Sequence, residues 1–547
     1  MHSPNPLDIA ELVDIVLEYL SMYDASIILA RARCVNRLWC SSATHRLWRK
    51  VDLSAVLRLL PRDAWFIYED DGRDDEDDGR DDEDSDGDIQ MDKPPSRHMV
   101  AYERGEYSHR SDDFENPTFV LRRLITEDEW SALLPFTRHV KFLYTIGGPG
   151  DPDALPSLKG ISFEAVVVYD LLSRCLPSFQ LFPQLEELVV LDYGNNPESM
   201  RLFDSDVLRV MRMEMDTTDG DAAACLSALT DVKHGLCPVQ YLVIDNSLVD
   251  QSDASAPSAL GNALRACDCL QRLHIDSLQM EGWCTVAAMP FLTELFVVDM
   301  GTYCDLLPSS AFIPAPLAFP ILRTLCLELG MDIYYFSLLL RMRDGIPWEL
   351  EKLHMPAQVD VCGNSARTMF NLIQAYVSAG TLESLIINCA AEPETDLPFD
   401  CIEPLLGFSN LTFLYVYTSF DCEPHFQALD RWEVNIIAGS FPRMRELHLS
   451  LKFPVTSLVA FAQFCPELEA LKVGAFVDRD LDYVDAAATC AGRSCQSMKL
   501  KRLDVGARLH EQEGPEKVAA VAFLKGIFPA ARFVHSDDII RGGEYFK

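Results

Sequence analysis

The sequence predicts an α/β solenoid, a stack of strand–helix repeats, preceded by a small all-α head. Two patterns support this fold class. Six-residue segments with apolar residues at positions one, four and six recur along most of the chain, and residues 1–60 before them carry helix-type apolar spacing. With 547 residues, 48% of them hydrophobic, the chain is long enough for several domains with buried cores.

The six-residue segments, or hexads, alternate in their last four residues in the manner of a strand. Clear copies begin at Leu185, Leu270, Leu292, Leu322, Leu350, Leu382, Leu411, Met444, Leu468 and Leu500. A weaker copy begins at Val239, and degenerate copies begin at Val140 and Phe163. From Leu270 the copies begin about 22 to 33 residues apart, with helical stretches such as 370–380 between them. One strand cannot bury its apolar side alone, so the copies are expected to stack into a parallel sheet.

This pattern resembles the leucine-rich-repeat family over roughly residues 140–535. The resemblance implies an arc of repeats with parallel strands on its concave face. The Asn or Cys that the family places three residues after the third apolar position is replaced in several copies, by Tyr193, Leu278, Gly330 and Ala390. The arc is therefore expected to be irregular. We assign residues 118–535 to the repeat domain and residues 536–547 to a C-terminal tail.

Residues 1–60 are predicted to form three short helices. Within 9–20, one helical stripe contains Leu12, Val13, Val16 and Leu20. A second helix is expected to run through Trp39, and a third to begin at Thr44, which can cap it. So small a unit has little depth of core. The rings of Trp39 and Trp48 therefore need cover, either from a partner protein or from the first turn of the repeat domain.

Residues 61–117 differ from both flanks because they are polar and strongly charged. The segment DGRDDED occurs twice in tandem, at 71–77 and 78–84. Like charges repel one another and bury no apolar surface, so this acidic linker is expected to be disordered. It acts either as a solvated spacer between two folded parts or as a docking strip for a basic partner.

The head resembles the F-box family over residues 7–53. The segment ELVDIVLEYL matches the family's opening helix, ARARCVNRLW the stretch around its Val and Trp, and RLWRKVDL its closing Leu–Trp pair. Ile9 stands where the family has Pro, and Asn36 where it has Cys. The resemblance implies docking to the Skp-type adaptor of an SCF cullin ubiquitin ligase, with aromatic anchors in the interface. The adaptor-binding residues are then Leu12, Val13, Val16, Leu20, Val35, Trp39, Leu47 and Trp48.

The fifth position of each hexad is expected to project from the concave face. Candidate target-binding residues at this position are His274, Phe296, His354, Tyr415 and His448, and other copies hold Val189, Cys326, Ile386, Lys472 and Asp504. A purely solvated face would be more polar, so this strip either binds a protein or is covered by the chain's own loops or tail. Neighbouring histidines of this set lie on the order of 14 Å apart along the sheet, too far for one metal ion or one catalytic relay.

Composition narrows the classes of function. A net charge of −37 argues against binding to nucleic acid or to anionic membranes. No apolar run is long enough for a membrane span, no secretory signal is visible, and the 17 cysteines form no CxxC pair. We therefore expect a cytoplasmic or nuclear protein. Because P-loop, HExxH, GxSxG and GxGxxG motifs are absent, we expect neither an enzyme nor a cofactor.

Together these features predict the substrate-recognition subunit of an SCF-type cullin-RING ubiquitin ligase. The head would bind the adaptor and the repeats would bind a target protein. Two alternatives stay open. The chain is otherwise a non-catalytic repeat scaffold whose head folds onto the arc, or a binder of basic proteins that uses the acidic linker.

Overall fold

The structure, a computed structural model, contains two compact units, Met1–Ser205 and Asp206–Lys547. The residues it describes are 10–21, 26–35, 37–68, 118–145, 162–163, 165–190, 197–214, 239–245, 256–278, 280–299, 318–328, 333–343, 345–360, 363–390, 399–418, 429–476, 499–505 and 515–533. The acidic residues 69–117, the tail at 536–547, Tyr193 and Gly330 lie outside the described residues.

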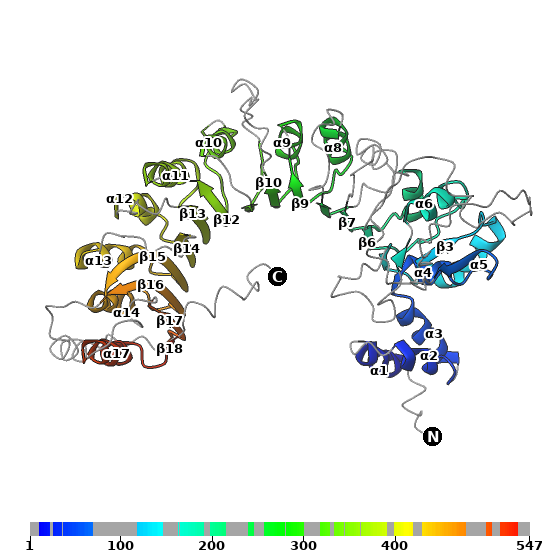
Figure 1. Ribbon diagram of the computed structural model, residues 1–547, viewed down its shortest axis with the longest axis horizontal. Helices are drawn as coiled ribbons and strands as arrows, with labels where there is room; N and C mark the ends of the chain where they lie inside the picture. The colour runs from blue at the N-terminus through cyan, green and yellow to red at the C-terminus, as the bar shows by residue number, and fades with distance from the viewer. Residues whose placement is uncertain are drawn as a thin grey trace, which may run out of the picture. The chain divides into compact units, whose positions relative to one another are not determined.

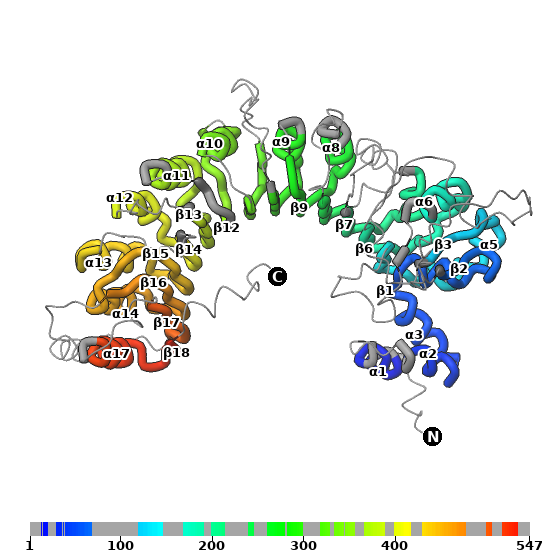
Figure 2. Tube along the Cα trace, in the orientation of Figure 1, coloured from blue at the N-terminus to red at the C-terminus, as the bar shows by residue number. Residues whose placement is uncertain are grey.

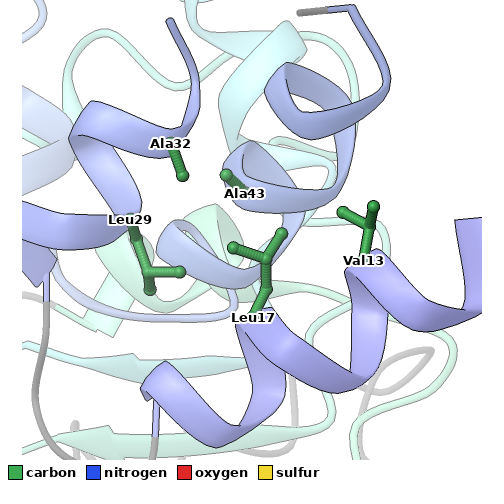
Figure 3. Packing of buried hydrophobic residues seen from close by; sticks show 5 residues of the cluster. All are labelled: Val13, Leu17, Leu29, Ala32 and Ala43. Atoms are coloured by element: carbon green, nitrogen blue, oxygen red, sulfur yellow. The ribbon is translucent and has the colours of Figure 1, made fainter. Parts of the chain in front are cut away.

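Three helices form the head of the first unit: α1 (Ala10–Ser21), α2 (Ser26–Ala32) and α3 (Arg37–Leu47). Their shared core consists of Val13 and Leu17 from α1, Leu29 and Ala32 from α2, and Ala43 from α3 (Figure 3). Partly buried Trp39 and Leu47 pack against this cluster. One apolar face of α1 therefore holds the three helices together, as its helical spacing predicts.

The chain leaves the helical conformation between α2 and α3, at residues 33–35. There the N–H of Val35 donates to the carbonyl of Ala32 in a tight turn at 3.1 Å. The prediction of one helix running through Trp39 is therefore wrong, and Trp39 lies in α3. Thr44 also lies inside α3 and is not the cap of a separate helix.

The head continues directly into a parallel sheet with the order β1–β4–β6. Its strands are β1 (Lys50–Asp52), β4 (Phe142–Tyr144) and β6 (Glu187–Val190). Val51 pairs with Leu143, and Leu143 pairs with Leu188, and all three side chains are buried. The hexads at Val140 and Leu185 are thus strands of one sheet. This unit also contains α4 (Leu53–Leu57), α5 (Glu127–Thr137), α6 (Ala165–Ser173) and the 3-10 helix η5 (Pro197–Phe203).

A second sheet in the first unit has the order β2–β3–β5, with β2 (Trp65–Tyr68), β3 (Thr118–Leu121) and β5 (Ser162–Phe163). Strands β2 and β3 are antiparallel, and Tyr68 pairs with Thr118. Residues 69–117 therefore connect two paired strands of one unit. Residues 61–68, which we assigned to the linker, are folded here because Trp65 stacks on Phe119 at 5.6 Å between ring centroids and both rings are buried.

The degenerate hexad at Phe163 is not a strand of the main sheet. Phe163 itself ends β5, which pairs with β3, and the following residues form α6. The prediction was wrong because the run AVVV lacks the polar alternation of a half-buried strand, and a continuous apolar run suits a buried helix equally well.

The second unit contains one sheet whose strands follow chain order from β7 to β18 (Figures 1 and 2). The strands are β7 (Val210–Glu214), β8 (Tyr241–Asp245), β9 (Arg272–Ser277), β10 (Glu294–Asp299), β11 (Thr324–Leu327), β12 (Lys352–Asp360), β13 (Ser384–Ala390), β14 (Phe413–Thr418), β15 (Glu446–Pro454), β16 (Ala470–Phe476), β17 (Arg502–Asp504) and β18 (Arg532–Phe533). Each strand pairs in parallel with the next.

Helices of the second unit lie on the outer side of this curved sheet (Figure 1). They are α8 (Ala256–Arg265), α9 (Met280–Ala287), α10 (Ile333–Arg341), α11 (Gly363–Tyr376), α12 (Phe399–Ile402), α13 (Arg431–Ser440), α14 (Val459–Phe464) and α17 (Pro515–Ile527), with the 3-10 helices η7 (Glu403–Gly407) and η8 (Val455–Leu458). The fourth and sixth residues of the hexads, such as Leu273 and Ile275, are fully buried. The predicted α/β solenoid with parallel strands on its inner face is therefore confirmed for this unit.

The register confirms the hexads from Val239 to Leu500 as neighbouring strands. It also shows a strand that the hexad search missed, β7, which pairs residue for residue with β8. Its segment LRVMRM has the same spacing, but Met211 and Met213 stand where Leu is usual. Methionine fills the same core positions, since both side chains are buried.

Candidate functional site

Helix α1 carries apolar side chains on two faces. Val13 and Leu17 are buried in the head, whereas Ile15 and Tyr19 keep 61% and 60% of their surface exposed. We name the exposed set the α1 stripe, and its members are Leu12, Ile15, Val16 and Tyr19. Spacings of three and four residues place these side chains on one side of the helix. An apolar surface of this kind is typical of a protein-binding helix.

The predicted adaptor-binding residues occupy several environments. Leu12, Val16 and Val35 are exposed, Trp39 and Leu47 are partly buried against the head core, and Val13 and Trp48 are buried. Leu20 belongs to α1, but its side chain lies outside the described part of the chain. The structure therefore brings only a subset of the predicted residues to the surface, and Val13 and Trp48 are removed from it by packing.

Trp48 is covered by the repeat part of its own unit. Its ring packs against Phe136 of α5 with 5.1 Å between ring centroids. Beside this contact the Nδ1 atoms of His45 and His139 lie 3.4 Å apart, and burial together with the charge of Arg138 lowers the pKa of His139. Of the two sources of cover considered for Trp48, the first turn of the repeats supplies it. The end of α3 is thereby fixed onto α5 and β4.

Ile15 and Tyr19 were absent from the predicted set although they are the most exposed apolar side chains of α1. The sequence contains a signal for them. The helix has two apolar stripes, one at 13 and 17 and another at 12, 15, 16 and 19, and a helix that packs on one face only needs a single stripe. The second stripe is an apolar face that the head core does not use.

The fifth hexad positions form a continuous row on the sheet face that is turned away from the helices. His274 pairs with Phe296, Phe296 with Cys326, and Cys326 with His354. The same register continues strand by strand to β15. We name this set the inner-face row, and its members from β8 to β15 are Val243, His274, Phe296, Cys326, His354, Ile386, Tyr415 and His448.

Side chains of the inner-face row contact one another along the sheet. The rings of His274 and Phe296 stack with 5.8 Å between centroids, and Tyr415 meets His448 edge-on at 5.7 Å. All members are half-buried except Cys326, which is fully buried. The candidate target-binding residues therefore lie together in one strip, as predicted. Their role in binding stays a prediction.

The three histidines of the row favour the neutral form. Burial, aided by the charge of Lys352, lowers the pKa of His354 to about 4. Burial and Lys472 lower the pKa of His448 to about 3. For His274, burial lowers the pKa and outweighs the opposite effect of Glu328 and Asp245. At neutral pH the row from β8 to β15 therefore carries no formal charge.

Charged side chains flank the row and are largely paired. Arg272 lies 3.4 Å from Glu294 at the start of β9 and β10. Glu446 lies 3.2 Å from Arg502 and accepts a hydrogen bond from the hydroxyl of Tyr415. On the last strands the fifth position becomes charged, where Lys472 contacts the buried Asp504 at 3.8 Å. The uncharged part of the row thus ends at β15.

The spacing of the three histidines follows from the strand order. His274, His354 and His448 lie on β9, β12 and β15, and two strands separate each neighbouring pair. His354 Nε2 lies 2.8 Å from Ser384 Oγ, and the other two rings contact aromatic neighbours. Among the described residues, no group of three or more His, Cys, Asp or Glu side chains is arranged to hold a metal ion.

Comparison with known proteins gives no family name for this chain. No family model and no curated protein matches it. Among solved structures, a leucine-rich-repeat protein of Leptospira interrogans aligns with a TM-score of 0.28 and 11% identity, covering 64% of this chain and 94% of that one. A Bacteroides fragilis protein aligns with a TM-score of 0.22 and 14% identity, covering 66% and 78%. The α/β solenoid is established by the register of the hexad strands themselves.

Within the described ranges, every helix is too short or too polar to cross a lipid bilayer.

Proposed function

We propose that this chain is the substrate-recognition subunit of an SCF-type cullin-RING ubiquitin ligase. In this proposal the α1 stripe binds a Skp-type adaptor, and the inner-face row binds a target protein in the cytoplasm or nucleus. One observation carries it. Helix α1 already packs a complete apolar face, Val13 and Leu17, into the head, and it still presents Ile15 and Tyr19 to solvent. A second apolar face on so short a helix indicates a second protein.

The energetics favour a partner for the stripe. Fully burying a large apolar side chain contributes about 1.5 to 3 kcal/mol, and the four stripe residues keep 41% to 61% of their surface exposed, so a partner that covers them gains about half of that sum. Val35, in the turn after α2, is 61% exposed and extends the apolar surface of the head. The F-box resemblance of residues 7–53 supplies the identity of the partner, because it rests on the same helix.

The alternative of a scaffold without ligase activity has one observation in its favour. Trp48 packs on Phe136 of α5, so the head does fold onto the first repeats. This contact uses the end of α3 and leaves the α1 stripe exposed. A scaffold head that satisfied itself in this way would not keep four apolar side chains at its surface.

The proposal includes no catalysis by this chain. A receptor subunit accelerates ubiquitin transfer by holding the target close to the conjugating enzyme, which raises the effective concentration of target lysines. Neither the α1 stripe nor the inner-face row needs a nucleophile or a metal for this purpose. Both need only shape and apolar area.

Adaptor binding tests the proposal directly. Purified full-length chain is immobilised, and its affinity for a purified Skp-type adaptor is measured by interferometry. We expect Ile15→Asp and Tyr19→Asp each to weaken binding at least about tenfold, because each places a charge in a desolvated interface. For Ile15→Asp the thermal unfolding midpoint should stay unchanged, since this side chain is exposed in the free chain.

Matched controls separate this result from misfolding. Val518→Asp alters an exposed apolar side chain of α17 in the second unit and should leave adaptor binding unchanged. Leu17→Ala should lower the unfolding midpoint, since Leu17 is fully buried in the head core. Absence of adaptor binding by the unaltered chain, or equal binding by the Ile15 and Tyr19 variants, would overturn the proposal.

A further inference from the structure

We infer that the inner-face row accepts an extended, basic protein segment of about ten residues that carries apolar or aromatic side chains. The inference rests on the proposed function for its setting, since it names the kind of target segment that the repeats would recognise. It concerns the strands β8 to β15 of the second unit. The length of the row sets the length of the segment. The uncharged character of the row favours apolar side chains, and the flanking carboxylates favour basic ones.

The length of the segment follows from the spacing of the strands. Neighbouring strands lie about 4.8 Å apart, so seven steps from β8 to β15 span about 34 Å. An extended chain advances about 3.4 Å per residue, so about ten residues cover the row. The pairing is continuous over this distance, and a ligand therefore meets one unbroken strip.

The chemistry of the inner-face row favours apolar side chains on the ligand. Phe296, Ile386 and Tyr415 are half-buried rather than covered, and the histidines between them are neutral. Such a strip stays partly desolvated beside its neighbours, so a charged ligand side chain placed on it would lose hydration without gaining a counter-charge. Apolar and aromatic side chains gain contact area there and have little hydration to lose.

Carboxylates along one border of the row, on or directly after β8, β9 and β11, favour basic side chains on the ligand. Asp245 and Asp276 lie two residues beyond the row on β8 and β9, and Glu328 lies two residues beyond Cys326. The charges of Asp245 and Glu328 reach the row, because both act to raise the pKa of His274. Arg212 of β7 acts in the opposite sense at the end of the row.

The opposite border presents a different set of side chains over β9 to β13. There Arg272 is paired with Glu294, the neighbouring positions hold the uncharged Thr324 and Ser384, and Lys352 is an exposed cation. Lysine and arginine side chains of a segment lying on the row can therefore reach the carboxylates of the first border, whereas acidic side chains would be repelled there. Charge complementarity therefore selects basic side chains at the end of the segment that lies over β8 to β11, whereas Lys352 and Lys472 act on the row at its other end.

A random peptide library tests the inference, because such a library does not require that the natural target be identified. The full-length chain is used to select binders from a phage-displayed library of twelve-residue peptides. We expect the enriched peptides to carry net positive charge together with several apolar or aromatic residues. Enrichment of acidic or uncharged peptides, or no enrichment over an uncoated surface, would overturn the inference.

Variants locate the binding to the row. The strongest enriched peptide is synthesised with a fluorescent label, and its affinity is measured by anisotropy. Phe296→Ala and Glu328→Lys should each weaken it at least about tenfold, and the unfolding midpoint of Glu328→Lys should stay unchanged. Trp432→Ala, at an exposed side chain of α13, should bind like the unaltered chain. Equal affinity for all three variants would place the peptide elsewhere and overturn the inference.

Two further readouts distinguish the outcomes. Adaptor binding is measured for the same variants. A chain that binds no adaptor and still selects basic peptides overturns the proposed function alone, and a chain that binds adaptor and selects no basic peptide overturns this inference alone. If peptides bind only after residues 534–547 are removed, the chain's own tail is the occupant of the row, and the inference is wrong as stated.

Discussion

At Gly474 the second-unit sheet leaves no space for a side chain. Strand β15 shifts register against β16 between Leu449 and Lys452, which brings the carbonyl oxygen of Leu451 toward Gly474. A Cβ added there would lie 2.9 Å from that oxygen, and the neighbour is backbone that cannot swing away. Glycine is therefore required by packing at this bulge.

Gly474→Ala should lower the free energy of unfolding by about 1 to 3 kcal/mol, the usual cost of overpacking. Urea unfolding of the full-length chain measures it. Gly439→Ala in α13 is the matched control, because nothing lies within 4 Å of its added Cβ and alanine favours the helix. Equal unfolding midpoints for both variants would contradict the close contact at Leu451.

The row histidines link stability to pH. His354 and His448 have pKa values of about 4 and about 3 when folded, against 6.5 for an ordinary histidine. As pH falls below about 6.5, the unfolded chain takes up protons that the folded chain refuses, so stability present above pH 6.5 is lost on acidification. Between pH 7 and pH 5 the loss should be about 2 kcal/mol for each histidine.

Urea unfolding at a series of pH values measures this dependence. The change in stability between pH 7 and pH 5 should shrink in the variant His354→Gln and shrink further when His448→Gln is added. Above about pH 8 all three proteins should show the same slope, because both histidines are neutral there in the folded and the unfolded chain. An unchanged slope below pH 6.5 in the double variant would show that burial of these rings does not control protonation.

At the scale of elements, the β2–β3 pair changes how the acidic residues 69–117 should be viewed. We predicted a linker between two folded parts, and the paired strands place both ends of this segment side by side in one unit. A connection of that kind is an insertion into a hairpin. Its ends are held by the stacked rings of Trp65 and Phe119.

Replacing residues 69–117 by Asn-Gly should therefore leave the fold intact. Closing a short loop costs less entropy than closing a long one, at about 0.6 kcal/mol for each doubling of length, so stability should rise by about 3 kcal/mol. Thermal unfolding and adaptor affinity of the shortened chain are the measurements. Phe119→Asp serves as the control that breaks the hairpin, since Phe119 is fully buried. A large loss of stability on shortening would mean that the insertion is part of the core.

At the scale of the whole molecule, the repeated strands could be predicted from the sequence because their apolar residues alternate with a period of two and the same pattern recurs in the neighbouring strands. In each hexad from Leu270 to Leu500 the apolar positions show which residues face the core, and therefore how the strand aligns with its neighbour. The order of the strands in the sheet then follows the order of the chain. Strand β7 was missed because methionine replaced leucine, and β1 because its hexad begins with Trp48 and continues to Val51 and Leu53. Both have the correct spacing with less usual apolar residues.

The exposed residues of the candidate surfaces were harder to predict from the sequence, for a physical reason. Helical spacing shows that Leu12, Val13 and Val16 share a helix, but it does not show which neighbour covers which face. Trp48 was assigned to a partner because its cover, Phe136, is far away in the sequence and belongs to another element. The inner-face row was predicted correctly in position because a strand has only two faces, and the buried face was already marked by leucine.

The passage from α3 into β1 sets the direction in which the α1 stripe points. Only Trp48 and Arg49 lie between the last residue of the helix and the first residue of the strand, and Trp48 is clamped by α5. Adding a single residue to α3 would turn everything before it by about 100° around the helix axis and move it by about 1.5 Å. The orientation of the head relative to β1 therefore changes in fixed angular steps, one for each residue added to or removed from α3. Length variants of α3 would swing a docked adaptor around the first repeats in steps.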